Sequence, residues 1–132
     1  MKQVSLISVI GGGLMGHGIA LTLARAGHQV RVTDPSDKAR LSLKTRVTES
    51  LRLLEVDANK IEAVLNNIVV CDTIKESVTD TEIVFEAGPE KLEVKQQIFS
   101  DLENYAPKNS ILASNTSVIP ITKIMQNLNG KH

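Results

Sequence analysis

Three glycines near the amino terminus have the spacing of a phosphate-binding loop. Gly11, Gly13 and Gly16 follow an apolar run and precede an amphipathic helical pattern, so they fit G-x-G-x-x-G in a strand–turn–helix context. Gly11 allows the tight turn, Gly13 lets the backbone approach a pyrophosphate, and Gly16 lets the helix pack close to the strand. The free N–H groups of the helix that begins at Leu14 and Met15 would then face phosphate oxygens. Ordinary turns also contain glycines, so the spacing alone is weak evidence for a phosphate-binding loop.

A carboxylate stands where a dinucleotide fold needs one. Asp34 ends the apolar run 29–33 and lies about 20 residues beyond the glycines, the position whose acid hydrogen-bonds ribose hydroxyls. Such a carboxylate accepts a hydrogen bond from a 2′-OH and repels a 2′-phosphate, and no Lys or Arg follows until Lys38. The pattern therefore favours NAD over NADP. Taken alone, Asp34 before Pro35 also suits an ordinary turn.

Composition limits the classes of protein to consider. The 132 residues suffice for one domain, 1–132, and the formal net charge is zero. Without a basic run, and with three aromatic residues, the chain lacks the features of nucleic-acid binding, and no apolar stretch is long enough for a membrane span. Met1 runs almost directly into a core strand, and Cys71 is the single cysteine. We therefore expect a cytoplasmic protein in which Cys71 is a small buried side chain.

Apolar runs of strand length alternate with helical patterns along the whole chain. Continuous Val/Ile runs suit a parallel sheet covered on both faces, and the alternation indicates right-handed βαβ units. The sequence therefore predicts an α/β fold with a Rossmann-like, doubly wound parallel sheet. We expect strands over 4–10, 29–33, 68–70, 83–86 and 111–114, and helices over 14–26, 36–54, 60–66, 92–105 and 119–128.

Two helices, rather than the usual one, are expected between the second and third strands. They would form a protruding helical hairpin, with Asp57 able to cap the second helix. Its lysines and arginines are interleaved with acids, so a solvated charged face is one interpretation. A surface that meets an anionic substrate, such as a nucleotide-tailed thioester, is the other.

Polar residues also follow the fourth and fifth strands, on the same edge as the glycine loop. Glu86-Ala-Gly-Pro-Glu90 closes one strand and Ser114-Asn-Thr-Ser117 closes the next. Helix capping would explain the second run by itself. Since doubly wound sheets bind ligands at the carboxyl ends of their strands, the convergence of three such ends favours a nucleotide site.

The order of these motifs resembles the amino-terminal domain of the L-3-hydroxyacyl-CoA dehydrogenases. The motifs are the glycine loop with Leu-Met-Gly-His-Gly-Ile-Ala, Asp34, Glu-Ala-Gly-Pro-Glu at 86–90, Leu-Glu-Val-Lys at 92–95 and Ala-Ser-Asn-Thr-Ser at 113–117. The resemblance implies hydride transfer between NAD and the 3-hydroxyl carbon of an acyl-CoA substrate. It places Glu90 and Lys95 near the nicotinamide ribose, Asn115 near the nicotinamide, Ser117 on the substrate's 3-oxygen and the hairpin beside the CoA site.

The chain also departs from the family pattern. Val118 follows Ser117 where the family has a second serine, which leaves the acyl preference open. The family's catalytic histidine lies in a His-aromatic-aromatic-Asn-Pro motif that these residues lack, together with its glutamate partner, the last strands and the carboxyl-terminal helical domain. His132 lies too close to Ser117 and in the wrong context for the base, and we expect His17 and His28 to be structural or solvated. We therefore expect NAD binding with negligible turnover.

Two further expectations follow from these departures. An uncovered sheet edge would favour association, so we expect a homo-oligomer. The alternative function is a stand-alone NAD(H)-sensing regulatory module, which would share the glycine loop and the acid after the second strand.

Overall fold

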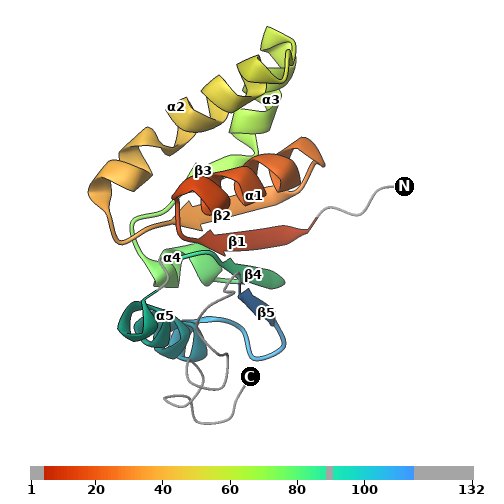
Figure 1. Ribbon diagram of the computed structural model, residues 1–132. Helices are drawn as coiled ribbons and strands as arrows, with labels where there is room; N and C mark the ends of the chain where they lie inside the picture. Colours follow the sequence, from red (N-terminus) through yellow and green to blue (C-terminus); the bar gives the residue numbers. More distant parts are fainter. Residues whose placement is uncertain (1–4, 89–90, 115–132) are drawn as a thin grey trace.

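The computed structural model describes residues 5–88 and 91–114. Its centre is a five-stranded parallel sheet in the order β3-β2-β1-β4-β5 (Figure 1). The strands are β1 (Leu6–Ile10), β2 (Gln29–Thr33), β3 (Ile68–Val70), β4 (Ile83–Glu86) and β5 (Ile111–Ser114). They agree with the predicted runs, except that β1 begins at Leu6 where a strand over 4–10 was predicted: Ser5 is not part of the strand, and residue 4 lies outside the described residues.

The order of the strands places β1 between the two halves of the sheet. The chain moves from β1 outward to β2 and β3, and then returns to the other side of β1 for β4 and β5. In the register, Ile10 lies level with Thr33 of β2 and Glu86 of β4, and Glu86 lies level with Ser114 of β5. The carboxyl ends of four strands therefore form one edge, at the switch point where such sheets bind ligands.

Helices cover both faces of the sheet. The helices are α1 (Leu14–Arg25), α2 (Asp37–Leu53), α3 (Ala58–Asn66), α4 (Ile74–Val78) and α5 (Leu92–Tyr105). Successive residues of a strand point to opposite faces, and accordingly Val9 belongs to the core beneath α1, α2 and α3 while Ile10 belongs to the core beneath α4 and α5. This confirms the doubly wound α/β fold.

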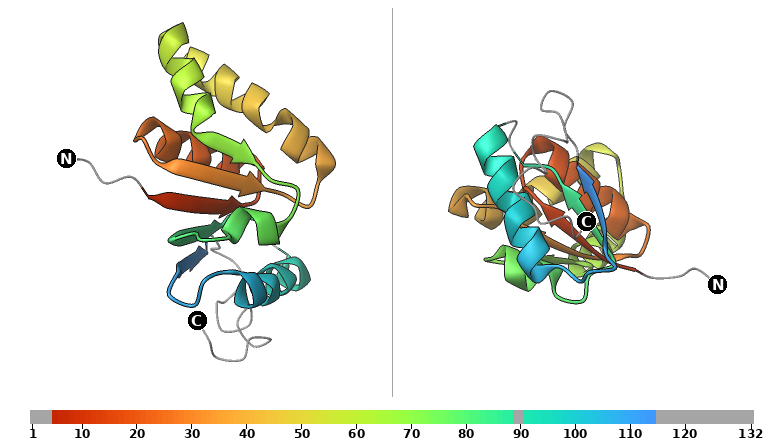
Figure 2. Two further views of the ribbon diagram at one scale, coloured as in Figure 1. Left: turned by 180° about the vertical axis from the view of Figure 1, so that it is seen from behind. Right: turned by 90° about the horizontal axis from the view of Figure 1, so that it is seen from below.

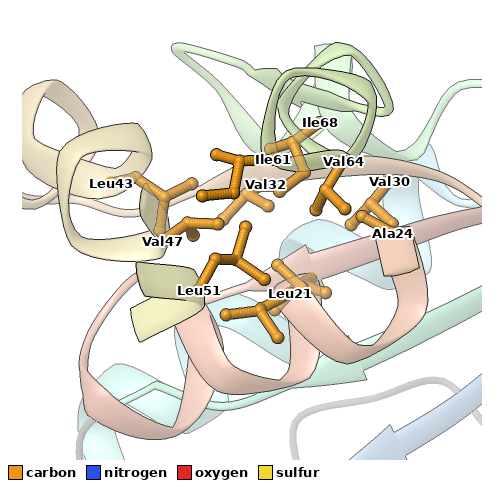
Figure 3. Packing of buried hydrophobic residues seen from close by; sticks show 12 residues of the cluster. Leu21, Ala24, Val30, Val32, Leu43, Val47, Leu51, Ile61, Val64 and Ile68 are labelled. Carbon is orange, nitrogen blue, oxygen red and sulfur yellow. The ribbon is translucent and has the colours of Figure 1, made fainter. Parts of the chain in front are cut away.

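The predicted hairpin consists of α2 and α3, which project from the β3 side of the sheet while α5 lies on the β5 side (Figures 1 and 2). Buried side chains of the hairpin pack against those of α1 (Figure 3). Ser36 caps α2, since its hydroxyl accepts a hydrogen bond from Ala39 N at 3.2 Å. Asp57 stands at the N-cap position of α3, but its side chain makes no capping bond, so that detail of the prediction was wrong.

The structure adds one helix that the sequence patterns did not predict. The five residues of α4 begin after Thr73, whose hydroxyl accepts from Glu76 N at 3.1 Å. The predicted helix over 119–128 lies outside the described residues. Within the described part of the chain, no helix is long and apolar enough to cross a membrane. Cys71 is buried as expected, and this burial raises the pKa of its thiol.

Candidate cofactor-binding site

The turn from β1 into the start of α1 can be built only with glycine at two positions. Gly11 has φ +119°, and a Cβ there would lie 2.5 Å from the carbonyl oxygen of Ala87. A Cβ on Gly16 would lie 1.7 Å from the carbonyl oxygen of Gly11, so α1 packs directly against the turn. Gly13, in contrast, is exposed, and its Cβ position has no atom within 4 Å. The loop is therefore tight on its inner side and open on its outer side.

The open side carries the amino terminus of α1. Gly13 is the N-cap, no side chain caps the helix, and no acidic residue occupies its first turn. Leu14 and Met15 are exposed there, with relative accessibilities of 82% and 56%. Backbone N–H groups in a first turn have no partner within the helix, and the helix dipole favours negative charge beside them. This arrangement suits a diphosphate.

Asp34 lies beside the glycine loop, as the spacing predicted. Its Oδ2 accepts a hydrogen bond from Gly12 N at 2.7 Å, and its Oδ1 accepts one from Ser36 N at 2.8 Å. The two bonds fix the direction of the half-buried carboxylate. Each oxygen has a further acceptor site. A ribose hydroxyl bound there would therefore meet an acceptor that is already oriented.

A cavity of about 500 Å³ opens next to Asp34, between the ends of β1 and β2 and the helices α4 and α5. Its lining combines apolar side chains with four carboxylates and contains neither lysine nor arginine among the described residues. A lining of this kind suits a flat uncharged ring better than a phosphate group, which the carboxylates would repel. The sequence patterns indicated Asp34 but not the walls that α4 and α5 provide. The lining residues are Ile10, Thr33, Asp34, Pro35, Asp72, Ile74, Glu93, Val94, Gln97, Ile98 and Asp101.

On the other side of the glycine loop, Lys95 is buried rather than displayed on a surface. Its ammonium nitrogen lies 2.9 Å from both carboxylate oxygens of Glu86, and both side chains are inaccessible to solvent. The role of Glu86 was missed in the sequence, although a carboxylate closing an apolar strand, followed nine residues later by a helical lysine, is a usable signal. The other predicted site residues, Glu90, Asn115 and Ser117, lie outside the described residues.

His17 links the glycine loop to the hairpin. Its Nδ1 lies 3.2 Å from the carbonyl oxygen of Gly13, and its Nε2 lies 3.2 Å from the Ser50 hydroxyl on α2. These contacts favour a structural role for His17. On the hairpin itself, Arg40 is paired with Asp37 and donates to the Asp34 carbonyl oxygen at 2.5 Å. That cation is therefore already neutralised, which favours a solvated, paired surface at this position.

This geometry agrees with a comparison against known families. Residues 6–132 match the family described as 3-hydroxyacyl-CoA dehydrogenase, NAD binding domain. The chain belongs to this family. The resemblance seen in the motifs is thereby confirmed, and the family is an NAD-binding one.

Individual relatives of this NAD-binding domain are longer proteins. The chain is 36% identical to human mitochondrial hydroxyacyl-coenzyme A dehydrogenase, covering 92% of the chain and 41% of the relative. It is 35% identical to a probable 3-hydroxybutyryl-CoA dehydrogenase of Bacillus subtilis, with coverages of 92% and 44%. A peroxisomal fatty acid beta-oxidation multifunctional protein of Arabidopsis thaliana is also 35% identical, but the chain spans 17% of it. The chain thus spans less than half the length of these relatives.

Solved structures of the family share the fold. FadB2 of Mycobacterium tuberculosis superposes with a TM-score of 0.87 at 30% identity, covering 96% of this chain and 46% of that one. The 3-hydroxybutyryl-CoA dehydrogenase of Escherichia coli gives 0.84 at 32% identity, with coverages of 95% and 27%. The Rossmann-like sheet is therefore the one found in the amino-terminal part of these dehydrogenases.

Proposed function

We propose that this domain binds NAD(H) for a 3-hydroxyacyl-CoA dehydrogenase that transfers a hydride between NAD and the 3-hydroxyl carbon of an acyl-CoA substrate. The observation that carries the proposal is the Asp34 carboxylate, held 2.7 Å from Gly12 N beside an open phosphate loop. One hydrogen bond thereby links Asp34, the proposed ribose acceptor, to the glycine loop that forms the proposed diphosphate site. The family match favours this function over a stand-alone NAD(H) sensor.

Each part of the cofactor has a matching group in the chain. Backbone N–H groups of Gly13, Leu14, Met15 and Gly16 would bind the diphosphate, with Gly11 providing the turn. Asp34 would accept hydrogen bonds from the adenosine ribose, and the acidic cavity beside it would receive adenine and reject a 2′-phosphate. When bound, the nicotinamide ring supplies the hydride chemistry, and the protein supplies binding and orientation.

The remaining assignments rest on the resemblance to the family. Glu90 and Lys95 would lie near the nicotinamide ribose and Asn115 near the nicotinamide. Ser117 would donate its hydroxyl hydrogen to the substrate's 3-oxygen. The hairpin would border the CoA moiety. Assembly into a homo-oligomer and a cytoplasmic location stay predictions, since the names of relatives include mitochondrial and peroxisomal proteins.

The 132-residue polypeptide should bind cofactor with little turnover of its own. Its histidines are not in the family's catalytic motif, and lack of a general base typically costs about 10²–10⁴ in rate. A steady-state assay of this polypeptide with acetoacetyl-CoA and NADH should therefore show negligible oxidation of NADH. Turnover at the rate of a complete dehydrogenase would contradict this part of the proposal.

Calorimetric titration tests the binding function directly. We expect saturable binding of NADH and at least about tenfold weaker binding of NADPH, because a 2′-phosphate would face Asp34 and the other carboxylates of the cavity. Titration with acetoacetyl-CoA on the same sample measures the substrate side separately. Absence of NADH binding, or equal affinities for NADH and NADPH, would contradict the proposed site.

A further inference from the structure

One buried carboxylate connects four segments at the edge of the sheet. Glu86, at the end of β4, accepts two hydrogen bonds from the Lys95 ammonium group, both at 2.9 Å. Its Oε2 also accepts from Gly88 N at 2.6 Å, and its Oε1 accepts from the Ser114 hydroxyl at 2.7 Å. The Glu86 cluster, defined as Glu86, Gly88, Lys95 and Ser114, thus joins β4, the loop after it, α5 and the end of β5.

The Glu86 cluster lies across β1 from Asp34. The next residue, Ala87, donates its N–H to the Ile10 carbonyl oxygen at 2.7 Å, and its own carbonyl lies against Gly11. The loop after β4 is therefore one wall of the glycine loop, and Asp34 on β2 stands at the opposite wall. A dinucleotide with its adenosine at Asp34 and its diphosphate at the glycines must extend its second nucleoside toward the ends of β4 and β5.

A contribution to the free energy of folding does not by itself explain why this ion pair is buried. Both charges are fully removed from water, and the loss of hydration of a buried ion pair commonly offsets most of the attraction between its members. What such a pair does provide is direction, because charge-assisted hydrogen bonds are short and strongly oriented. With four hydrogen bonds on one carboxylate, a displacement of Glu86 disturbs the backbone at Gly88 and the ammonium of Lys95 together.

We propose that Glu86 is a positioning residue for the nicotinamide half of the cofactor site. It does not face the cofactor, since its side chain is inaccessible, but it holds the backbone at Gly88, directly after β4, and the ammonium group of Lys95. The inference rests on the proposed NAD(H) function and assigns Glu86 to one half of that site only. The adenosine half, built on Asp34, should be independent of it.

The variant Glu86→Asp separates positioning from simple charge pairing. Aspartate keeps the negative charge beside Lys95 but is one methylene shorter, so it cannot make all four hydrogen bonds in the same geometry. NADH and ADP are titrated into the wild-type chain and the variant, because ADP carries the adenosine and diphosphate without the nicotinamide riboside. We expect NADH affinity to fall about tenfold while ADP affinity changes less than about twofold, a loss typical of a displaced binding group.

Two serine variants complete the design. Ser114→Ala removes only the bond from β5 and leaves the ion pair intact, so it tests the cluster even if Glu86→Asp does not fold. It should lower the affinity for NADH by a few-fold and leave the affinity for ADP unchanged. The control is Ser8→Ala, which removes a fully buried hydroxyl, bonded to Ser77 O and to Thr81 Oγ1, in the middle of β1. That control should lower the melting temperature without changing the ratio of NADH to ADP affinity.

The possible outcomes distinguish this inference from the proposed function. Equal losses for NADH and ADP in the folded Glu86 cluster variants, or no loss for either, would overturn the positioning role while NADH binding by the wild-type chain stands. Absence of NADH binding by the wild-type chain would overturn the proposed function, and this inference with it.

Discussion

At the scale of single residues, Asp34 has two roles that a substitution separates. Its carboxylate fixes the glycine loop through Gly12 N and is proposed to bind the ribose. Asp34→Asn keeps the size but removes the charge, and a hydrogen bond to a charged group contributes about 1.5–3 kcal/mol. We therefore expect NADH affinity to fall at least about tenfold. NADPH affinity should fall less, because the repulsion of its 2′-phosphate falls at the same time.

Paired titrations of NADH and NADPH measure this change in preference. Asp57→Asn is the matched control, since Asp57 is exposed at the start of α3 and its side chain makes no capping bond. The control should leave both affinities unchanged. An Asp34→Asn variant that kept the wild-type ratio of NADH to NADPH affinity would remove Asp34 from the selectivity argument.

Residue-level prediction succeeded where the determinant is local. The glycine turn and the place of Asp34 beside it were predicted because a tight turn, a helix start and a strand end each leave a mark at fixed spacing. The burial of Lys95 against Glu86 was not predicted, because it depends on how α5 packs on β4. A lysine is ordinarily exposed, and although the carboxylate nine residues before it offers a partner, the sequence gives no sign that the pair is enclosed.

At the scale of elements, α1 requires glycine at position 16 but not at position 18. Gly16→Ala would place a methyl group 1.7 Å from the Gly11 carbonyl oxygen, so the helix must move away from the phosphate loop. We expect destabilisation of about 3 kcal/mol and loss of NADH binding. Gly18→Ala meets no atom within 4 Å in the same helix, so it should stabilise by about 0.5–1 kcal/mol. Urea unfolding and NADH titration measure both variants, and equal effects would contradict the packing argument.

The hairpin offers a second matched pair. Leu51 of α2 is fully buried in the core shared with α1 and α3 (Figure 3), whereas Leu53 of the same helix is 85% exposed. Leu51→Ala should lower the free energy of unfolding by about 2–5 kcal/mol, because it leaves a cavity. Leu53→Ala should change it by less than about 0.5 kcal/mol. Similar losses in chemical denaturation would mean that α2 is not anchored by this buried face.

The elements also show which of them are too short to be predicted from a repeating sequence pattern. Four of the five strands and the long amphipathic α5 were predicted at their observed bounds because each repeats a signal over several residues, whereas β1 was predicted over 4–10 and is Leu6–Ile10. The five-residue α4 is too short to establish a period. The sequence does contain one indication of α4: Thr73 is followed three residues later by Glu76, which is a capping-box pattern typical of a helix start.

At the scale of the whole molecule, the site exists only when the sheet is assembled. The glycine loop follows β1, Asp34 follows β2, and the loop after β4 supports Gly11, so residues far apart in sequence form one surface. Strand order could be proposed from the family resemblance and the βαβ rule. The cavity beside Asp34 could not, because its walls come from α4 and α5 and from side chains whose facing depends on packing.

Because the unfolded chain has no such surface, NADH should bind the folded state alone and stabilise it. At a concentration about 100 times its dissociation constant, a ligand of this kind adds about 2.7 kcal/mol to the free energy of unfolding. For a domain of this size the melting temperature should rise by about 10 °C. NADPH at the same concentration should raise it less, and the Asp34→Asn variant should lose much of the NADH effect. Equal shifts with NADH and NADPH would show that the stabilising contacts lie at the diphosphate alone and that the carboxylates around the adenosine cavity do not discriminate.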